Sequence, residues 1–488
     1  MKLAAQGLLL FWLASTTVVH AQISKFQHVV VIFQENRTPD NLFQGLCVPP
    51  YGKSSSCSTT PSSTQYNIQT SNWLDNKSPG GTIQPATVPL AGPYDLGHSH
   101  SDWVGMCDLS AGDCKMDGAS LVKCGPAKAC PSNPQFRYVD NSQGIVNPYL
   151  EMATQYGWAN YMFQTNQGPS FPAHQFIFGG TSAPTALDDS KAIFASENMQ
   201  NSGIGGLKAV AGCTALDGSG GTSSTTVALI QPPGTETKSV YPCFEHETMA
   251  DLFPPKVTWK YYAPSAGSIW TAPNAIQHIC MSSGPGGKCT GPEWTNNVDL
   301  TPADVLEDIA NCNLRSVNWV IPTGQNSDHA NDNDGGGPSW VAAVVNAIGN
   351  NTTCETTGYW KNTAIFITWD DWGGWYDHEP PTILTGNQGD YQFGFRVPLI
   401  VVSAYTPKGH INNARHNFGS ILRFIQHNFG IEEGALNFVD ERTTTDLTGF
   451  FELKTPPRAF LEISAPKKAE FFLKDKRPAT EPDNDVEP

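Results

Sequence analysis

Hydrophobic residues gather in short unbroken runs along this chain. Three runs stand out: "HVVVIF" at 28–33, "TAIFITW" at 363–369 and "VPLIVVS" at 397–403. A continuous apolar run of this length is typical of a strand that is covered on both faces, as in a parallel sheet. The pattern therefore predicts buried strands of a mainly parallel sheet.

Helical spacing of apolar residues appears between these runs. "SWVAAVVNAIGN" at 339–350 predicts a helix with Ser339 as its cap and an end near Gly349. "FGSILRFIQHNFG" at 418–430 predicts a second helix that stops at Gly430. Because strands alternate with helices, the expected fold is an α/β three-layer sandwich with a mainly parallel central sheet.

Two segments rich in Ser, Pro, Gly or Cys interrupt this pattern, at about 47–135 and 200–243. Both are interpreted as disulfide-stapled insertions in one domain, residues 22–463, and not as separate domains. The polar, Pro-containing residues 464–488 predict a mobile C-terminal tail.

The first 21 residues predict the compartment. They combine a Lys, an apolar core and a small-residue end, which is typical of a secretory signal peptide, 1–21; a short membrane anchor is the alternative. The even count of 12 cysteines then predicts disulfides, with local pairs expected and the connectivity left open. Asn-X-Thr patterns at 36–38, 350–352 and 351–353 fit the glycosylation motif of a secreted glycoprotein, extracellular or periplasmic, although Asn36 should stay unmodified if it binds metal and the sequence leaves open whether the other sites are used.

Charge and composition narrow the partners. The formal net charge is −16, and no basic stripe suggests a nucleic-acid partner. Only 15% of residues are charged, whereas Gly (45) and Pro (37) are plentiful, which favours a loop-rich globular protein over a disordered one. The sequence does not fix the oligomeric state.

Acidic and amide side chains follow two of the expected strands. Glu35 and Asn36 come after the strand at 28–33, and Asp370 and Asp371 come after the strand at 363–369. Ligands of open α/β sheets bind at the carboxyl ends of the strands, and clustered carboxylates repel each other unless a cation lies between them. Oxygen ligands predict Ca²⁺, Mg²⁺ or Mn²⁺, although Zn²⁺ also accepts carboxylates. The alternative is that these are helix caps or solvated loop acids.

The segment "TNQGPSFPAHQF" at 165–176 places Ser170 among prolines. We expect a stiff turn that aims the hydroxyl at the metal, since metal coordination is one way to activate a weak nucleophile. The alternative is an ordinary serine in a proline-rich turn. No G-x-S-x-G motif occurs, which argues against an α/β-hydrolase.

Two histidine-containing segments complete the candidate chemistry. "DLGHSHSDW" offers His98 and His100, and "QNSDHANDNDGGG" offers Asp328 followed by His329. A histidine in such a place can stabilise phosphoryl oxygens or protonate a leaving alkoxide, although a lone histidine is more often structural.

These motifs, taken in order, resemble one family. They are "HVVVIFQENRTPDNLFQGL", "KMDG", "GPSFP", "SDHA", "AIFITWDDWGGWYDHEPP", "GFRVPLIVVSAYTPKG" and "HNFGSILRFIQHNFGI". Together they cover about residues 26–450 and resemble the bacterial-type phosphoesterases, which include non-specific phospholipases C and a related group of acid phosphatases.

The resemblance implies an alkaline-phosphatase-like sandwich and a metal-dependent site. It implies a divalent metal ion held by Glu35, Asn36, Asp370 and Asp371. It also implies a nucleophile that forms a phosphoenzyme, and groups around the phosphate: Ser170, with His98, Asp328 and His329. His100 is less secure, because the neighbouring histidine leaves the local match ambiguous.

The substrate class stays open between two readings. Serine at the nucleophile position and the short C-terminal part favour an acid-phosphatase-like phosphomonoesterase. A phospholipase C that meets a membrane lipid surface is the alternative, and Trp372, Trp375 and Tyr376 are candidates for that surface, or for the wall of the pocket. A sulfatase is disfavoured because "PSFPAH" lacks the required Arg. A non-catalytic secreted binding protein is the remote alternative.

Overall fold

The computed structural model describes residues 23–110, 112–125, 129–196, 200–201, 211–216, 225–232, 234–383 and 393–480. The expected signal peptide, 1–21, lies outside the described residues, as does part of the expected insertion at 200–243. No helix of the described part is long and apolar enough to cross a bilayer.

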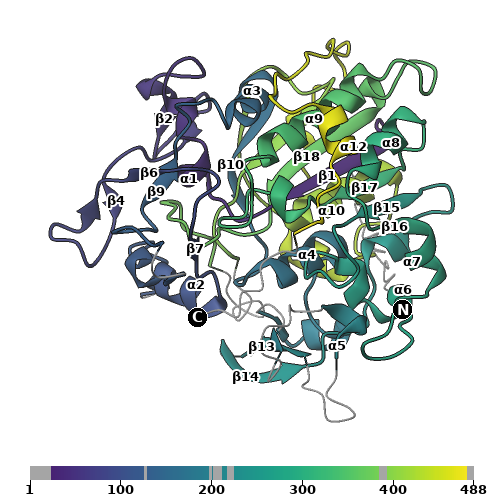
Figure 1. Ribbon diagram of the computed structural model, residues 1–488, viewed down its shortest axis with the longest axis horizontal. Coiled ribbons are helices and arrows are strands. Elements are labelled where there is room, and N and C mark those ends of the chain that lie inside the picture. Colours follow the sequence, from purple (N-terminus) through teal and green to yellow (C-terminus); the bar gives the residue numbers. More distant parts are fainter. Residues whose placement is uncertain are drawn as a thin grey trace, which may run out of the picture.

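An eight-stranded mixed sheet forms the centre of the described part, in the order β16-β15-β17-β1-β18-β19-β10-β20 (Figure 1). Its strands are β1 (His28–Gln34), β10 (Gly157–Phe163), β15 (Trp259–Tyr262), β16 (Val298–Asp299), β17 (Val317–Val320), β18 (Thr363–Trp369), β19 (Leu399–Ser403) and β20 (His410–Asn417). β1 and β18 pair in parallel along their whole lengths, and both are completely buried. The mainly parallel sheet is therefore confirmed.

One of the three strands that the apolar segments predicted is antiparallel to its neighbours in the sheet. β19 is antiparallel to both of its neighbours, β18 and β10. A continuous apolar run reports that a strand is covered on both faces, and it carries no information about strand direction. The apolar run at 397–403 therefore identified a buried strand of a mainly parallel sheet, but not the direction of that strand.

Helices cover both faces of the sheet. The rings of Tyr149 in α3 (Asn147–Gln155) and Trp369 in β18 lie 5.1 Å apart, whereas Phe366 of the same strand lies 4.9 Å from Phe424 in α10 (Phe418–Phe429). Positions 366 and 369 face opposite sides because side chains alternate along a strand. The first layer continues with α8 (Asp304–Ala310), α9 (Gly337–Asn350) and α12 (Ala469–Lys474), and the second with α4 (Ser170–Gly179) and α11 (Asn437–Arg442). The three-layer sandwich is confirmed.

The two helices expected from periodicity are present, with one corrected boundary. α9 begins at Gly337 with Pro338 in its first turn, so Ser339 lies inside the helix and is not its cap. Proline at the first positions of a helix costs no hydrogen bond, which explains the earlier start. α10 stops at Gly430, whose φ of 69° is the left-handed conformation that glycine supplies at helix ends.

Part of the expected mobile tail is packed onto the domain. Phe472 of α12 is buried, and its ring lies 5.3 Å from that of Trp340 in α9. Lys467 and Arg477 both form ion pairs with Asp334. The mostly polar composition of 464–488 gave no indication that Phe472 packs against the domain. Residues 481–488 lie outside the described part.

A second hydrophobic core lies beside the sheet, within the first expected insertion. Its large side chains include Trp73, Trp103 and Phe136, and Trp372 and Trp375 join them from the loop after β18. Short elements frame it: α1 (Pro39–Leu42), β2 (Cys57–Ser58), β3 (Tyr66–Asn67), β4 (Trp73–Leu74), β5 (Thr82–Ile83), β6 (Ala86–Val88), β7 (Asp95–Leu96), α2 (His100–Cys107), β8 (Cys124–Gly125) and β9 (Arg137–Val139). Figure 1 shows these elements gathered on one side of the sheet.

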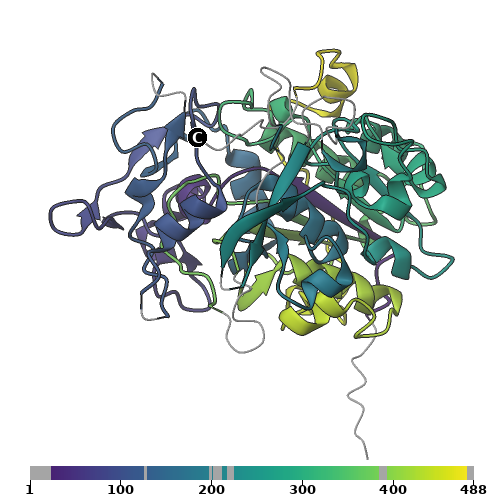
Figure 2. The ribbon, with the colours of Figure 1, turned by 90° about the horizontal axis from the view of Figure 1, so that it is seen from below.

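The second expected insertion contributes a β-hairpin. β13 (Thr225–Gln231) and β14 (Thr235–Val240) pair antiparallel, with β11 (Phe194–Ala195) and β12 (Gln200–Asn201) along β13. The hairpin lies away from the central sheet and faces the viewer in Figure 2. The remaining helices are α5 (Ala186–Asp189), α6 (Gln277–Cys280) and α7 (Pro292–Asn297).

All 12 cysteines form disulfides. The pairs are Cys47–Cys57, Cys107–Cys114, Cys124–Cys130, Cys213–Cys243, Cys280–Cys289 and Cys312–Cys354. Four of the six disulfides lie within the two expected insertions, in agreement with the expected pairing of cysteines that are close in the sequence. The last one closes the longest loop, with a sequence separation of 42.

Candidate active site

The carboxyl ends of β1 and β18 bring the expected acidic residues together. Gln34 and Trp369 are partners in the parallel register, so Glu35 and Asp370 leave the sheet side by side. The backbone N–H of Asn36 donates to Asp370 Oδ1 at 2.9 Å. Both acids and the amide are completely buried, and so is Asp371.

Ser170 reaches this cluster from a different layer. Its Oγ lies 3.4 Å from Glu35 Oε2 and 3.5 Å from Asp371 Oδ2. The residue does not lie in a turn, as the flanking prolines suggested, because it is the first residue of helix α4. Pro172 is tolerated there because the N–H groups of the first turn have no partner within the helix. The N-terminus of a helix also favours a neighbouring negative charge.

The backbone beside the cluster needs glycine. Gly373 and Gly374, in the loop after Asp371, have φ values of 60° and 70°. A Cβ at Gly373 would lie 2.6 Å from the backbone oxygen of Asn36. Asn36 itself has a φ of 59°, an uncommon conformation for a residue with a side chain and one that is found at functional sites.

The buried charges of the cluster are poorly balanced within the protein. Burial, with the charge of Asp370 next, raises the pKa of Glu35 and the pKa of Asp371 well above their usual range. Burial also raises the pKa of Asp370, but the neighbouring Glu35 and the backbone N–H of Asn36 outweigh it and lower that pKa. Burial lowers the pKa of His174 to about 3, so this imidazole is neutral near pH 7.

A divalent cation fits these donors. Among the described residues, Asn36 Oδ1 and Asp370 Oδ2 are buried without a hydrogen-bond partner. Buried polar atoms are almost always hydrogen-bonded, so orphaned acceptors that gather beside two further carboxylates are the arrangement expected of an ion site. The geometry thus suits the four residues nominated from the sequence: Glu35, Asn36, Asp370 and Asp371.

The histidines nominated from the sequence surround the cluster unequally. Asn36 Nδ2 donates to His98 Nε2 at 3.3 Å, and His98 Nδ1 donates to the backbone oxygen of Leu96 at 2.7 Å. The ring of His329 lies 6.2 Å from that of His98, and both histidines lower the pKa of Asp371 against the larger effect of burial. Both therefore stand beside the acidic cluster.

Asp328 and His100 lie farther out. Asp328 Oδ2 accepts hydrogen bonds from the Tyr149 hydroxyl at 2.8 Å and the Trp369 indole at 3.0 Å, and burial raises its pKa to about 6. Among the described residues, the hydrogen bonds of the Asp328 side chain are with Tyr149 and Trp369 and not with the four nominated metal ligands. His100 begins α2 and stacks on Trp103 within the second core.

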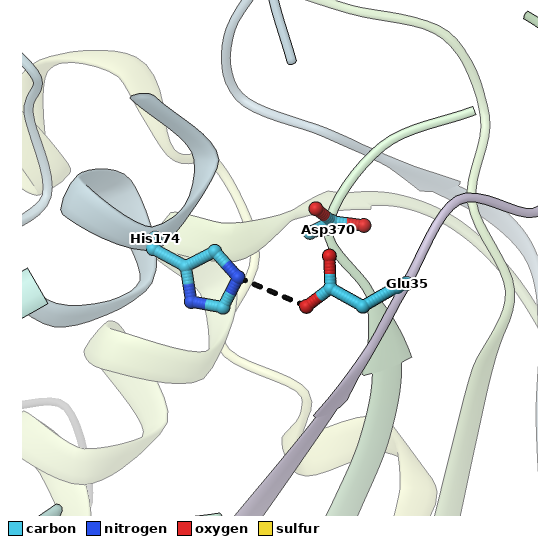
Figure 3. Close-up of side chains that lie close together, drawn as sticks. All are labelled: Glu35, His174 and Asp370. Atoms are coloured by element: carbon cyan, nitrogen blue, oxygen red, sulfur yellow. Dashed lines mark hydrogen bonds and ion pairs between the residues drawn. The ribbon is translucent and has the colours of Figure 1, made fainter. Parts of the chain in front are cut away.

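The sequence reasoning missed one residue of the site, His174. Its Nε2 lies 3.1 Å from Glu35 Oε1. One ring nitrogen of His174, one carboxylate oxygen of Glu35 and one of Asp370 all lie within 4.8 Å of one another, which is close enough to share a metal ion (Figure 3). His174 follows Ser170 by four positions, and residues i and i+4 share one face of a helix. That spacing would have identified His174 once residues 170–179 were read as a helix.

A second acidic group lies nearby, formed by Asp40, Asp377 and His378. Arg396 is completely buried and donates to Asp377 Oδ1 at 3.0 Å and to Asp377 Oδ2 at 2.9 Å. It also lies 3.5 Å from Asp40 Oδ1, and His378 Nδ1 lies 2.7 Å from Asp40 Oδ2. Since an arginine already supplies the positive charge, this group needs no metal ion.

Comparisons with known proteins agree with the motifs. The profile of the Phosphoesterase family matches residues 26–432. Phospholipase C B of Mycobacterium tuberculosis is 27% identical over 176 residues, which cover 32% of this chain and 33% of that protein. Non-hemolytic phospholipase C of Burkholderia pseudomallei is 29% identical over 187 residues, which cover 33% of this chain and 26% of that protein. The match thus spans about a third or less of the length of these relatives.

A longer match and a solved structure complete the comparison. Hemolytic phospholipase C of Pseudomonas aeruginosa is 21% identical over 349 residues, which cover 64% of this chain and 42% of that protein. A solved protein in the alkaline phosphatase superfamily from Vibrio parahaemolyticus aligns with a TM-score of 0.34 at 10% identity, covering 62% of this chain and 64% of the other.

Proposed function

This chain belongs to the Phosphoesterase family, and we propose that it is a secreted, metal-dependent hydrolase of phosphate esters that acts through a phosphoserine at Ser170. The observation that carries the proposal is the position of one buried hydroxyl. Ser170 Oγ lies within 3.5 Å of two carboxylates that come from two different strand ends. Six disulfides support an oxidising, extracytoplasmic location.

The proposed metal is divalent, with Ca²⁺, Mg²⁺, Mn²⁺ and Zn²⁺ as candidates, and its ligands are Glu35, Asn36, Asp370 and Asp371. When bound, such an ion neutralises charge on the phosphoryl oxygens and increases the nucleophilicity of a neighbouring hydroxyl. Phosphoryl transfer depends mainly on positioning and charge stabilisation, and a buried cluster supplies both.

In the proposed reaction, Ser170 is the nucleophile, and His98 and His329 act on the phosphoryl and leaving-group oxygens. Ser170 gives its proton to a neighbouring carboxylate, Glu35 or Asp371, and its Oγ attacks phosphorus. The bond from phosphorus to the leaving alcohol breaks, and a phosphoserine remains. Water then attacks the same phosphorus, the bond from phosphorus to Ser170 Oγ breaks, the serine takes back its proton, and inorganic phosphate leaves. His98 and His329 balance the charge of the phosphoryl oxygens, and one of them protonates the leaving alcohol. Asp328 holds the segment that carries His329.

Soluble phosphomonoesters are the favoured substrates. Trp372, Trp375 and Tyr376 were the candidates for a lipid-facing surface, and all three are at most 1% exposed. The rings of Trp372 and His98 lie 6.2 Å apart, whereas Tyr376 stacks on Trp73 in the second core, so these buried aromatics offer no membrane contact. A phospholipase C is the second candidate, and the names of the relatives favour it.

The test combines a substrate panel with trapping of the intermediate. Metal-loaded enzyme would be assayed on a soluble phosphomonoester, a phosphodiester and phosphatidylcholine micelles, and acid-quenched mixtures would be searched by mass spectrometry for phosphate on Ser170. Ser170→Ala should abolish turnover and trapping. Ser182→Ala is a matched control, because Ser182 is also buried and its hydroxyl bonds only to the backbone oxygen of Ala195 among the contacts described.

The outcomes separate the alternatives. Phosphate release from the monoester supports the favoured activity. Diacylglycerol release from the micelles, with no phosphate release from the monoester, supports phospholipase C. Full turnover by Ser170→Ala would remove this serine from the mechanism. No turnover on any member of the panel would leave the binding-protein alternative.

A further inference from the structure

His174 lies at the metal site, although its role does not follow from the oxygen donors. It is completely buried in α4, one turn after Ser170. Figure 3 shows its ring directed at Glu35 and Asp370, with Nε2 3.1 Å from Glu35 Oε1. Because the second nitrogen of the ring has its own partner, the position of the imidazole proton can be worked out.

That partner is the hydroxyl of Tyr261, which lies 3.3 Å from His174 Nδ1. The hydroxyl donates its single hydrogen to the backbone oxygen of Trp270 at the much shorter distance of 2.7 Å. The Tyr261 oxygen can therefore only accept from His174, so Nδ1 carries the proton. Nε2 of the neutral ring then directs a lone pair at Glu35.

Two atoms that direct lone pairs at each other across 3.1 Å repel unless a proton or a cation lies between them. The surroundings make this costly, because Glu35, His174 and Asp370 are all completely buried. A metal ion resolves the conflict, and a metal-ligating histidine usually donates its other N–H to a fixed acceptor, as His174 does here.

We propose that His174 Nε2 is a direct nitrogen ligand of the metal ion, beside oxygens of Glu35 and Asp370. Imidazole suits zinc, copper, iron and nickel, whereas calcium and magnesium are bound almost entirely through oxygen. The site therefore selects a transition metal or zinc over Ca²⁺ and Mg²⁺. This inference rests on the metal centre of the proposed function, and it narrows the identity of the ion.

X-ray absorption at the zinc edge tests the ligand directly, because the ring atoms of a bound imidazole give a characteristic scattering signature. Zinc-loaded wild-type protein would be compared with His174→Gln, and the zinc dissociation constant would be measured for each by competition with a chelator. His416→Gln is the matched control: His416 is also buried, and its ring bonds to Thr445 and Asn412, away from the acidic cluster.

The expected result is imidazole scattering in the wild type and the control that falls in His174→Gln. Zinc binding by that variant should weaken at least about tenfold, since even groups that only support a ligand are worth about 10–100-fold. Tyr261→Phe is the second variant, in case His174→Gln does not fold. It should keep the scattering and weaken zinc binding by about 10–100-fold.

Three results would overturn the inference, and they distinguish it from the proposed function. Imidazole scattering that is unchanged in His174→Gln, or imidazole scattering that is absent from zinc-loaded Tyr261→Phe, removes His174 from the ligands while hydrolysis through Ser170 stands. Stoichiometric Ca²⁺ that zinc cannot displace has the same consequence. Protein that binds no metal ion at all removes both the ligand assignment and the metal-dependent mechanism.

Discussion

Replacing Arg396 with methionine should destabilise this protein strongly, and more at high pH than at low pH. The guanidinium is completely buried and forms a bidentate contact with Asp377. Its Nη1 also donates to the backbone oxygens of Asn67 at 2.8 Å and Asn160 at 2.9 Å. One side chain thereby joins the first insertion, strand β10 and the loop after β18.

The size of the loss follows from what methionine leaves behind. It removes the positive charge but leaves Asp377 and Asp40, both completely buried, without that partner. Removing one partner of a buried ion pair typically costs about 3–5 kcal/mol, because the other charge stays in a poorly solvating environment. We expect a loss of unfolding free energy in that range near pH 8.

The pH dependence follows from the pKa of Asp377. Burial raises this pKa to about 6, with Arg396 lowering it and Asp40 raising it. A carboxyl with a raised folded-state pKa binds its proton more tightly in the folded protein than in the unfolded one. It therefore destabilises the fold increasingly as pH rises from the usual carboxyl value through about 6. Loss of Arg396 enlarges this effect, so acid should partly rescue the variant.

Urea unfolding of Arg396→Met and wild type, with disulfides intact, would be followed by tryptophan fluorescence at about pH 5 and about pH 8. Arg415→Met is the matched control, because the Arg415 side chain is 43% exposed and its pair with Glu379 at 2.8 Å should be worth at most about 1 kcal/mol. A loss below about 1 kcal/mol in Arg396→Met, or an equal loss at both pH values, would refute the reasoning.

The other predictions concern the metal site, a disulfide and a surface histidine. Asp370→Asn should lower the metal content measured by mass spectrometry, and full metal content in that variant would exclude this carboxylate from the site. Chelation of the wild-type metal should lower the melting temperature and zinc should restore it; binding at about a thousand times the dissociation constant is worth about 4 kcal/mol, so an unchanged melting temperature would contradict a tight site. Replacing Cys312 and Cys354 with alanine should cost about 4 kcal/mol of unfolding free energy, from the separation of 42 residues, and a loss under about 1 kcal/mol in urea would argue against it. The hydrogen bond that His278 Nε2 donates to Asp251 raises the pKa of His278 to about 9, so its stabilising effect is complete below about pH 6.5 and is lost as pH rises through about 9; His278→Gln should flatten that part of the pH–stability curve.

The sequence was most informative where a residue type and its local context agree. Apolar runs identified the buried strands β1 and β18, and the residues directly after them were enough to nominate Glu35 and Asp370. These predictions needed only the rule that parallel strands present their carboxyl ends at one edge. The direction of β19 could not be predicted, because burial on both faces does not depend on direction.

The missing parts of the site depend on contacts between distant segments. His174 became visible only when Ser170 proved to begin a helix, which its flanking prolines concealed. The tautomer of that histidine depends on Tyr261, which lies in strand β15, 87 positions farther along the chain than His174. Likewise, Arg396 gives no local sign that it neutralises Asp377, because the two residues lie 19 positions apart in the chain.

The loop after β18 serves two parts of the molecule within a few residues. It begins with Asp370 and Asp371 at the sheet edge, and then places Trp372 and Trp375 in the second core. The insertion is therefore not a detachable cap. Excising it would expose the indoles of Trp372 and Trp375, which closely follow the two acids in the chain.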